Sequence, residues 1–276
     1  MKKIYGILFF LFIILATSYS QINVITYNIR LNTSSDGVHA WPYRKADVVN
    51  LLRFHKADIF CLQEALHDQV NYVDSSMAEF SFAGVGRDDG IEAGEYSPVF
   101  YRTSRFELLD KGNFWLSKTP DLPGLGWDAA CIRICSYVTL KDRNNGKEFM
   151  VFNTHFDHVG VKARIHAANL IQEKIDELAG NSPVILCGDL NLPPESKSVR
   201  KIASYLDDAM VISELPPFGE NGSWSGFTYD DFQGERIDYI FVTPGTRVLR
   251  YGILTDSRDR SFFSDHLPVL AEVVLP

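Results

Sequence analysis

Side chains that could bind a metal ion or a phosphate follow directly after apolar stretches of this sequence. The stretch Val184–Cys187 leads through Gly188 into Asp189-Leu190-Asn191. Four apolar residues in succession suit a strand that is buried on both faces. Gly188 would let the backbone turn at the strand end and would place Asp189 and Asn191 just beyond it, where scaffolds of this kind often carry chemistry. Taken alone, the Asp-Leu-Asn sequence favours an ordinary turn before the next helix.

Four other apolar stretches are bordered in a similar way. Three of them are followed by a polar residue, namely Asn28, Glu64 and His155. The last stretch is preceded by an adjacent acid and imidazole, Asp265 and His266. Carboxylate and amide oxygens are ligands of hard divalent cations, and imidazoles beside them can contact phosphate groups. The combined set therefore indicates metal-assisted chemistry on a phosphate ester.

Six short blocks then make the sequence recognisable. TYNIR, LQE, NTH, GDLN, RIDYIF and SDHLPV occur in this order between Thr26 and Val269. The chain thereby resembles the endonuclease/exonuclease/phosphatase superfamily, which includes pancreatic-type deoxyribonucleases, neutral sphingomyelinases and deadenylases. The resemblance implies an α/β fold, specifically a four-layer α/β sandwich of two packed mixed β-sheets flanked by helices. It also implies hydrolysis of a phosphate ester.

The resemblance assigns the metal ligands. Glu64 falls on the metal-binding glutamate of the superfamily, and Asp265 is expected to approach the same cation. Asn28 is expected to ligate the cation or to form a hydrogen bond beside it. Mg²⁺ or Mn²⁺ fits a site with few protein ligands and open water positions. A surface acid at the start of a helix is the alternative interpretation of Glu64.

The resemblance also assigns the catalytic residues. Asp189 and Asn191 would orient the attacking water and a phosphoryl oxygen, with Asp189 as the base. His266 would contact the phosphate, and Asp238 matches the carboxylate that fixes the tautomer and charge of this ring. His155 matches a position that stabilises the transition state or the leaving group.

A second set of residues is offered as substrate-binding candidates. Arginines could form forked bonds to phosphate, although ordinary salt bridges remain an alternative. Strand-like alternation would place His155 and Asp157 on one side of the chain and His158 on the other. Aromatic residues in long loops could form a rim, or could simply anchor those loops. The candidates are Arg133, Asp157, His158, Arg164, Tyr96, Trp127 and Trp224.

Periodicity predicts the elements that must position these residues. Strands are expected at 22–28, 58–63, 80–84, 97–102, 106–116, 131–140, 148–154, 183–188, 237–242, 247–254 and 269–274. Helices are expected at 43–54, 66–77, 162–179 and 196–205, the third with apolar residues at helical spacing and Gly180 at its end. This pattern suits two mixed sheets with helices outside, but periodicity alone leaves α/β and α+β open.

Residues 1–20 are predicted to be a signal peptide. Lys2 and Lys3 precede an apolar run from Ile4 to Ala16, and Ser18-Tyr19-Ser20 supplies small residues before a cleavage site at Gln21. The run is shorter than the roughly 20 apolar residues that span a bilayer. We therefore expect a secreted or periplasmic protein without a transmembrane anchor, with one catalytic domain at 21–276 that acts as a monomer.

The net charge of the protein argues against extended nucleic acid as the substrate. The formal charge is −8, and removing Lys2 and Lys3 leaves 25 basic against 35 acidic residues, a charge of −10. Proteins that bind extended nucleic acid normally present a basic face, and this sequence has no run of Lys or Arg.

The leading hypothesis is therefore a secreted metal-dependent phosphoesterase that hydrolyses a phosphodiester or phosphomonoester of a small or lipid-derived substrate by in-line attack of water. An exported nuclease is the alternative. A non-catalytic binding protein would be expected to have lost Glu64, Asp189 or His266, and all three are present.

Overall fold

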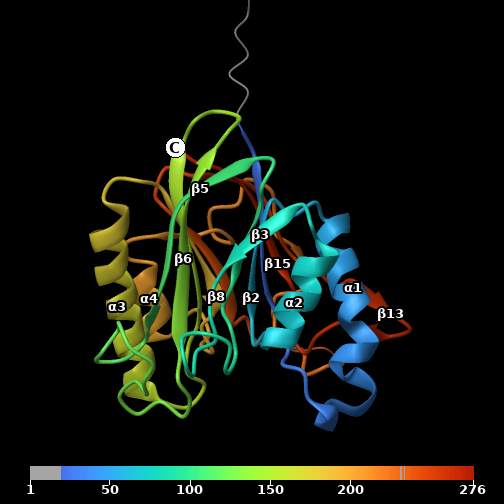
Figure 1. The fold of residues 1–276 in the computed structure, drawn as a ribbon. Coiled ribbons are helices and arrows are strands. Elements are labelled where there is room, and N and C mark those ends of the chain that lie inside the picture. The colour runs from blue at the N-terminus through green and yellow to red at the C-terminus, as the bar shows by residue number, and fades with distance from the viewer. Residues whose placement is uncertain (1–19, 231, 233) are drawn as a thin grey trace, which may run out of the picture.

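Two β-sheets packed face to face form the centre of the molecule (Figure 1). The computed structural model describes residues 20–230, 232 and 234–276, so residues 1–19 of the predicted signal peptide lie outside the described part. The first sheet has seven strands in the order β10-β12-β15-β1-β2-β4-β3. Its strands are β1 (Ile22–Asn28), β2 (Ile59–Gln63), β3 (Phe80–Ala83), β4 (Val99–Arg102), β10 (Phe218–Gly219), β12 (Arg247–Ile253) and β15 (Val269–Val274).

The second sheet has six strands in the order β5-β6-β7-β8-β11-β9. A separate two-stranded sheet joins β13 (Ser257–Arg258) to β14 (Ser261–Phe262). The strands of the six-stranded sheet are β5 (Phe106–Trp115), β6 (Ile134–Asp142), β7 (Glu148–His155), β8 (Val184–Asp189), β9 (Asp207–Asp208) and β11 (Asp238–Val242).

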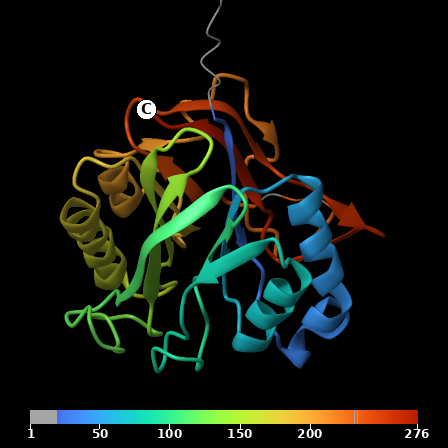
Figure 2. The ribbon, with the colours of Figure 1, turned by 45° about the horizontal axis from the view of Figure 1, so that its top comes forward.

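Helices cover the outer face of each sheet, and Figure 2 shows the two helix groups on opposite sides of the molecule. The first sheet is covered by α1 (Trp41–Phe54), which a short 3₁₀ helix η1 (Ser34–His39) precedes, and by α2 (His67–Ser76). The second sheet is covered by α3 (Val161–Ala179) and α4 (Lys197–Ile202). The predicted α/β sandwich with two mixed sheets flanked by helices is therefore confirmed.

Alternation along the strands produces three apolar layers. Val24 of β1 faces the space between the sheets and packs in one cluster with Ile185 of β8. Its neighbour Ile25 faces the other way and packs in a cluster with Leu52 of α1. Because successive side chains of a strand point to opposite faces, each sheet contributes one face to the central layer and one to a helix layer.

Most predicted elements agree with the structure within two residues, two differ more clearly, and five short elements were not predicted. β6 begins at Ile134 rather than at 131, because the backbone N–H groups of Ala130 and Cys131 donate to Asp157 instead of to a neighbouring strand. α4 ends at Ile202, where Ala203 caps it, rather than at 205. η1 and the short strands β9, β10, β13 and β14 have no counterpart in the sequence prediction.

No helix in the described part of the chain is both long and apolar enough to cross a bilayer. The proposed leader lies outside that part, so its role remains a prediction.

Candidate active site

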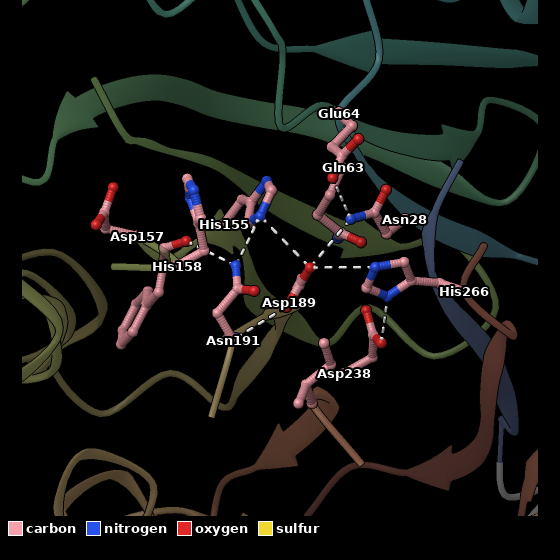
Figure 3. Close-up of polar contacts among 12 residues, drawn as sticks. Asn28, Gln63, Glu64, His155, Asp157, His158, Asp189, Asn191, Asp238 and His266 are labelled. Atoms are coloured by element: carbon pink, nitrogen blue, oxygen red, sulfur yellow. Dashed lines mark hydrogen bonds and ion pairs between the residues drawn. The ribbon is translucent and has the colours of Figure 1, made fainter. Parts of the chain in front are cut away.

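The predicted site residues lie at one edge of both sheets because of the strand register. The parallel pair β1 and β2 places Asn28 beside Gln63, the residue before Glu64. The parallel pair β7 and β8 places His155 beside Asp189, and antiparallel β11 places Asp238 on the other side of Asp189. Parallel strands end at the same edge of a sheet, so these side chains converge (Figure 3).

The backbone adopts uncommon conformations at this edge. Glu64 and Asn191 have φ values of 58° and 50°, a region that few residues other than glycine occupy. Gly188 lies inside β8 rather than in a turn after it, which corrects the sequence-based expectation. A Cβ atom at Gly188 would lie 2.2 Å from the carbonyl oxygen of Thr154, so the glycine allows β7 and β8 to approach closely.

Asp189 lies at the centre of the cluster. Its Oδ2 atom accepts a hydrogen bond from Asn28 Nδ2 at 3.0 Å and lies 3.4 Å from His155 Nε2 and 3.8 Å from His266 Nε2. Burial and the neighbouring Asp238 carboxylate raise the pKa of Asp189 to about 7. A carboxylate with a pKa near neutrality can accept a proton from water at physiological pH.

His266 is held by a carboxylate on the far side of its ring. Its Nδ1 atom lies 2.8 Å from Asp238 Oδ2, and both residues are buried. Burial alone would lower the pKa of His266, but the Asp238 and Asp189 carboxylates raise it well above its ordinary value. His266 is therefore an imidazolium at neutral pH and can donate a hydrogen bond to a phosphoryl oxygen.

His155 has the opposite surroundings. Arg133 Nη1 donates to its Nδ1 atom at 2.9 Å, and Asn191 Nδ2 lies 3.0 Å from its Nε2 atom. Burial lowers the pKa of His155 well below its ordinary value, and the Arg133 and Arg87 guanidinium groups lower it further. The His155 ring is therefore neutral at physiological pH.

The donor set suits a divalent cation. Glu64 and Asp265 both line one pocket. The pKa of Asp265 is raised mainly by burial and, to a smaller extent, by the nearby Glu64 carboxylate. Arg30 lies 3.7 Å from Glu64 Oε2 and 3.8 Å from Asp265 Oδ2, so the two carboxylates border one cation-attracting position. Asn28 Nδ2 donates to Glu64 Oε1 at 3.1 Å and leaves Asn28 Oδ1 to accept from the backbone N–H of Arg30. Two carboxylate groups and an adjacent amide match the ligands of Mg²⁺ or Mn²⁺.

Two further groups of described residues have ligand atoms within 4.8 Å of one another. Asp189, Asp238 and His266 form the hydrogen-bonded cluster already described. The other group is Cys131, Asp157 and His158, but the two oxygens of Asp157 already accept four backbone N–H groups. These four hydrogen bonds occupy both oxygens of Asp157, so a cation is disfavoured there.

The cluster opens into a pocket of about 460 Å³. Asp189, Asn191, His155, His266, Glu64 and Asp265 line it together with Arg30, Leu31, Glu95, Cys131, Arg133, His158, Trp224, Glu235 and Ile237. Asn28 and Asp238 are fully buried and contact the lining residues from behind. The pocket therefore brings together the Glu64 and Asp265 carboxylates, the His266 imidazolium and the buried base Asp189.

Comparison with known proteins identifies this arrangement. The sequence profile of the Endonuclease/Exonuclease/phosphatase family matches residues 25–266. The chain belongs to this family. Its members are phosphoric ester hydrolases that depend on divalent metals, and the chain is accordingly a metal-dependent hydrolase of phosphoric esters.

Solved structures with this fold include two proteins of Bacteroides thetaiotaomicron. An endonuclease/exonuclease/phosphatase family protein is 39% identical, covers 93% of this chain and 98% of its own, and superposes with a TM-score of 0.89. A mannosyl-6-phosphatase is 39% identical, covers 92% of this chain and 100% of its own, and has a TM-score of 0.88.

A relative outside bacteria is the 3'-5'-exoribonuclease subunit Ccr4 of the CCR4-Not complex from Emericella nidulans. It is 29% identical over 171 residues, which cover 51% of this chain and 25% of that protein. The chain thus matches only about a quarter of the length of this relative.

Three of the substrate-binding candidates line this pocket and four do not. Arg133, His158 and Trp224 line it. Tyr96 instead contacts His67 through its hydroxyl, and Trp127 stacks on His166.

Asp157 and Arg164 also have supporting positions. Asp157 binds four backbone N–H groups, and Arg164 donates to the carbonyl oxygen of Asp157 at 3.1 Å. The expected alternation is wrong, because β7 ends at His155 and the chain turns. One guanidinium group, that of Arg133, consequently contacts both His155 and His158.

Sequence reasoning missed Arg30 and Glu95. Glu95 lies 3.7 Å from Arg133 and 3.8 Å from His155 Nδ1 and forms an ion pair with Arg87. Burial raises the pKa of Glu95. Glu95 precedes the strand β4 rather than following a strand, so a search restricted to polar residues after apolar runs passes over it. Arg30 lies within the TYNIR block two residues after Asn28, but the sequence alone does not show that it contacts Glu64 and Asp265.

Proposed function

We propose that this chain is an exported phosphomonoesterase that releases phosphate from a phosphorylated sugar with the help of Mg²⁺ or Mn²⁺. The observation that carries this proposal is the 39% identity to a mannosyl-6-phosphatase across 92% of the chain. The acidic composition also favours a small substrate over extended nucleic acid. A pocket of about 460 Å³ has the size range of small-molecule sites.

Each residue of the cluster has a role in the proposed hydrolysis. Asp189 accepts a proton from the attacking water, and Asn191 helps to orient that water and a phosphoryl oxygen. The His266 imidazolium donates to a phosphoryl oxygen while Asp238 holds the ring in place. His155 lies across Asp189 from His266 and stabilises the departing alcohol oxygen (Figure 3).

Glu64, Asp265 and Asn28 would hold the divalent ion. Such an ion, when bound, neutralises charge on the phosphoryl oxygens.

The first test is hydrolysis by the purified mature chain. Mannose 6-phosphate, sphingomyelin, inositol phosphates and DNA are compared in the presence and absence of Mg²⁺ or Mn²⁺. We expect release of phosphate from the sugar phosphate and loss of activity in chelator. The Glu64→Gln variant should lose about 100-fold or more in turnover at low metal concentration, because a ligand carboxylate is removed.

Glu177→Gln is the matched control, because Glu177 is exposed on α3 and pairs only with Lys174 among the described contacts. It should retain the wild-type rate. Full activity of Glu64→Gln in chelator would contradict the metal assignment.

A nuclease is the second candidate, and the similarity to Ccr4 favours it. A nuclease that relies on the phosphate backbone would cleave single-stranded substrates with a steep dependence on salt. The proposed sugar phosphatase should instead show little cleavage of such substrates. The proposed export also predicts that protein from the native cells begins at or near Gln21.

A further inference from the structure

The pocket has a second polar wall beside His155 that the proposed hydrolysis does not use. Arg133 forms its centre, with Nη1 2.9 Å from His155 Nδ1 and Nη2 3.1 Å from His158 Nδ1. Glu95 lies 3.7 Å from the same guanidinium group. Figure 3 shows the rings of His155 and His158 next to each other, on the opposite side of Asp189 from His266.

Glu95 and His158 both line the pocket, and each has one polar atom that no described residue contacts. Arginine does not lose its proton in proteins, so Nδ1 of His158 accepts the bond from Arg133 and the proton of a neutral His158 ring resides on Nε2. Within the described part of the chain, His158 Nε2 has no hydrogen-bond partner. Glu95 Oε1 likewise has none there, because the Arg87 and Arg133 contacts of Glu95 are made through Oε2.

The charges of the wall compensate one another. The Arg133 guanidinium lies between Glu95 at 3.7 Å and Asp157 at 3.8 Å, and Arg87 forms an ion pair with Glu95. Two arginines therefore face two carboxylates. A second phosphate group would meet the Glu95 carboxylate, whereas a neutral hydroxyl can donate to Glu95 and accept from His158.

We infer that Glu95, Arg133 and His158 form a subsite for the alcohol part of the substrate, and that this alcohol carries several hydroxyl groups. Glu95 Oε1 accepts a hydrogen bond from one hydroxyl, and the Nε2–H group of His158 donates to another. Arg133 is a positioning residue that fixes the His158 ring. The inference rests on the proposed phosphatase function and places the leaving group beside His155.

The test compares two substrates with the same phosphate and different alcohols. Mannose 6-phosphate has hydroxyl groups on its leaving group, whereas 4-nitrophenyl phosphate has none. The His158→Phe variant keeps a ring of similar shape and removes the donor. It should lower the ratio of kcat/KM for mannose 6-phosphate over that for 4-nitrophenyl phosphate by about 10-fold, because one hydrogen bond to the sugar is lost.

The variant should act mainly through KM for the sugar phosphate. Unphosphorylated mannose should also inhibit the wild type more strongly than the variant, which is a readout independent of turnover. His166→Phe is the matched control, because His166 is exposed on α3 and stacks on Trp127 outside the pocket. It should leave the substrate ratio unchanged.

The outcomes separate the two proposals. Equal losses on both substrates would show that His158 only supports the catalytic residues and would overturn the subsite. Glu95→Gln provides a second check, because it retains the size and one acceptor oxygen but removes the charge. The subsite predicts a smaller loss of the substrate ratio for Glu95→Gln than for Glu95→Ala, and equal ratios in both variants and the wild type would also overturn it. A wild type that hydrolyses DNA or 4-nitrophenyl phosphate but not mannose 6-phosphate would instead contradict the proposed function.

Discussion

The two buried histidines on either side of Asp189 have the same side chain and similar burial but opposite partners. His266 Nδ1 faces the Asp238 carboxylate at 2.8 Å, whereas His155 Nδ1 faces the Arg133 guanidinium at 2.9 Å. The carboxylates raise the pKa of His266, and burial and the guanidinium groups lower the pKa of His155. The carboxylates therefore oppose and outweigh the effect of burial at His266, whereas the guanidinium groups act in the same direction as burial at His155.

This difference separates two tasks within one small site. In the proposed mechanism, a charged His266 would attract the phosphoryl oxygens, while a neutral His155 would avoid adding a second positive charge close to the first. The His266 charge itself contributes to the lowered pKa of His155. The two proposals accordingly assign the phosphate to the Asp238 side and the uncharged alcohol to the Arg133 side.

The largest expected effect concerns Asp189, which both histidines share. Asp189→Asn keeps the size of the side chain but removes the proton acceptor. We expect turnover to fall by about 10²–10⁴-fold at saturating metal, the range for loss of a general base. The measurement is the steady-state rate of hydrolysis of the substrate that the comparison of phosphate esters identifies. Asp110→Asn on the exposed part of β5 is the control, and a loss smaller than 10-fold for Asp189→Asn would remove its assignment as the base.

The second prediction concerns the His266 side of the comparison. Activity should fall as pH rises through the raised pKa of His266, because the ring loses its donor proton. Asp238→Asn removes the main stabilising charge of the imidazolium, so this alkaline limb should move to lower pH. Asp238 also raises the pKa of Asp189, so the acid limb should move to lower pH as well. Both limbs of the pH–activity profile should therefore move to lower pH.

Turnover of Asp238→Asn should decrease by about 10–100-fold, in line with loss of a supporting carboxylate. A double-mutant cycle with His266→Ala tests whether the pair acts as a unit. His266→Ala alone should be nearly as damaging as the double variant, because coupled residues are not additive. Additive losses with an unmoved alkaline limb would show that the two residues work separately.

The sequence predicted the residues on the Asp238 side together with the pairing of Asp238 and His266. On the other side it named Arg133 and His158 as candidates, but it predicted neither their contacts nor Glu95. Asp189, Asp265 and His266 border apolar stretches in recognisable blocks, so the end of a strand locates them. The structure brings all eight predicted catalytic and metal-binding residues into one cluster. Their contacts follow from β-sheet register, which is largely determined by buried strands.

The other side depends on loops. Arg133 precedes β6, and His158 follows β7 where the chain has already turned, so the period of a strand no longer predicts which side chains meet. Glu95 comes from the segment before β4, and its proximity to Arg133 results from packing between the two sheets. The fold class and the layers were predictable because apolar periodicity repeats over whole strands and helices. Single contacts between loops have no such repetition.

The third prediction concerns His155, the other histidine of the comparison, and the substitution it uses is expected to have the smallest effect on turnover. Arg133→Met retains much of the side-chain volume but removes the guanidinium charge beside His155. Arg87 remains near the ring as a second positive group, while Glu95 at 3.8 Å and Asp189 at 3.4 Å remain as negative groups. With one positive neighbour removed, the pKa of His155 should rise toward its ordinary value, although burial continues to hold it down.

The pH titration of the His155 ring protons, followed by NMR, measures this change directly. Arg133→Lys is the matched control, because lysine retains the positive charge and loses only the fork that contacts both imidazoles. If charge determines the state of His155, the ring should titrate at higher pH in Arg133→Met than in Arg133→Lys, and Arg133→Lys should stay close to the wild type. If the hydrogen bond to Nδ1 determines it, the two variants should titrate alike. That second result would show that the two histidines differ through donor geometry, and the explanation by partner charge would then apply to His266 alone.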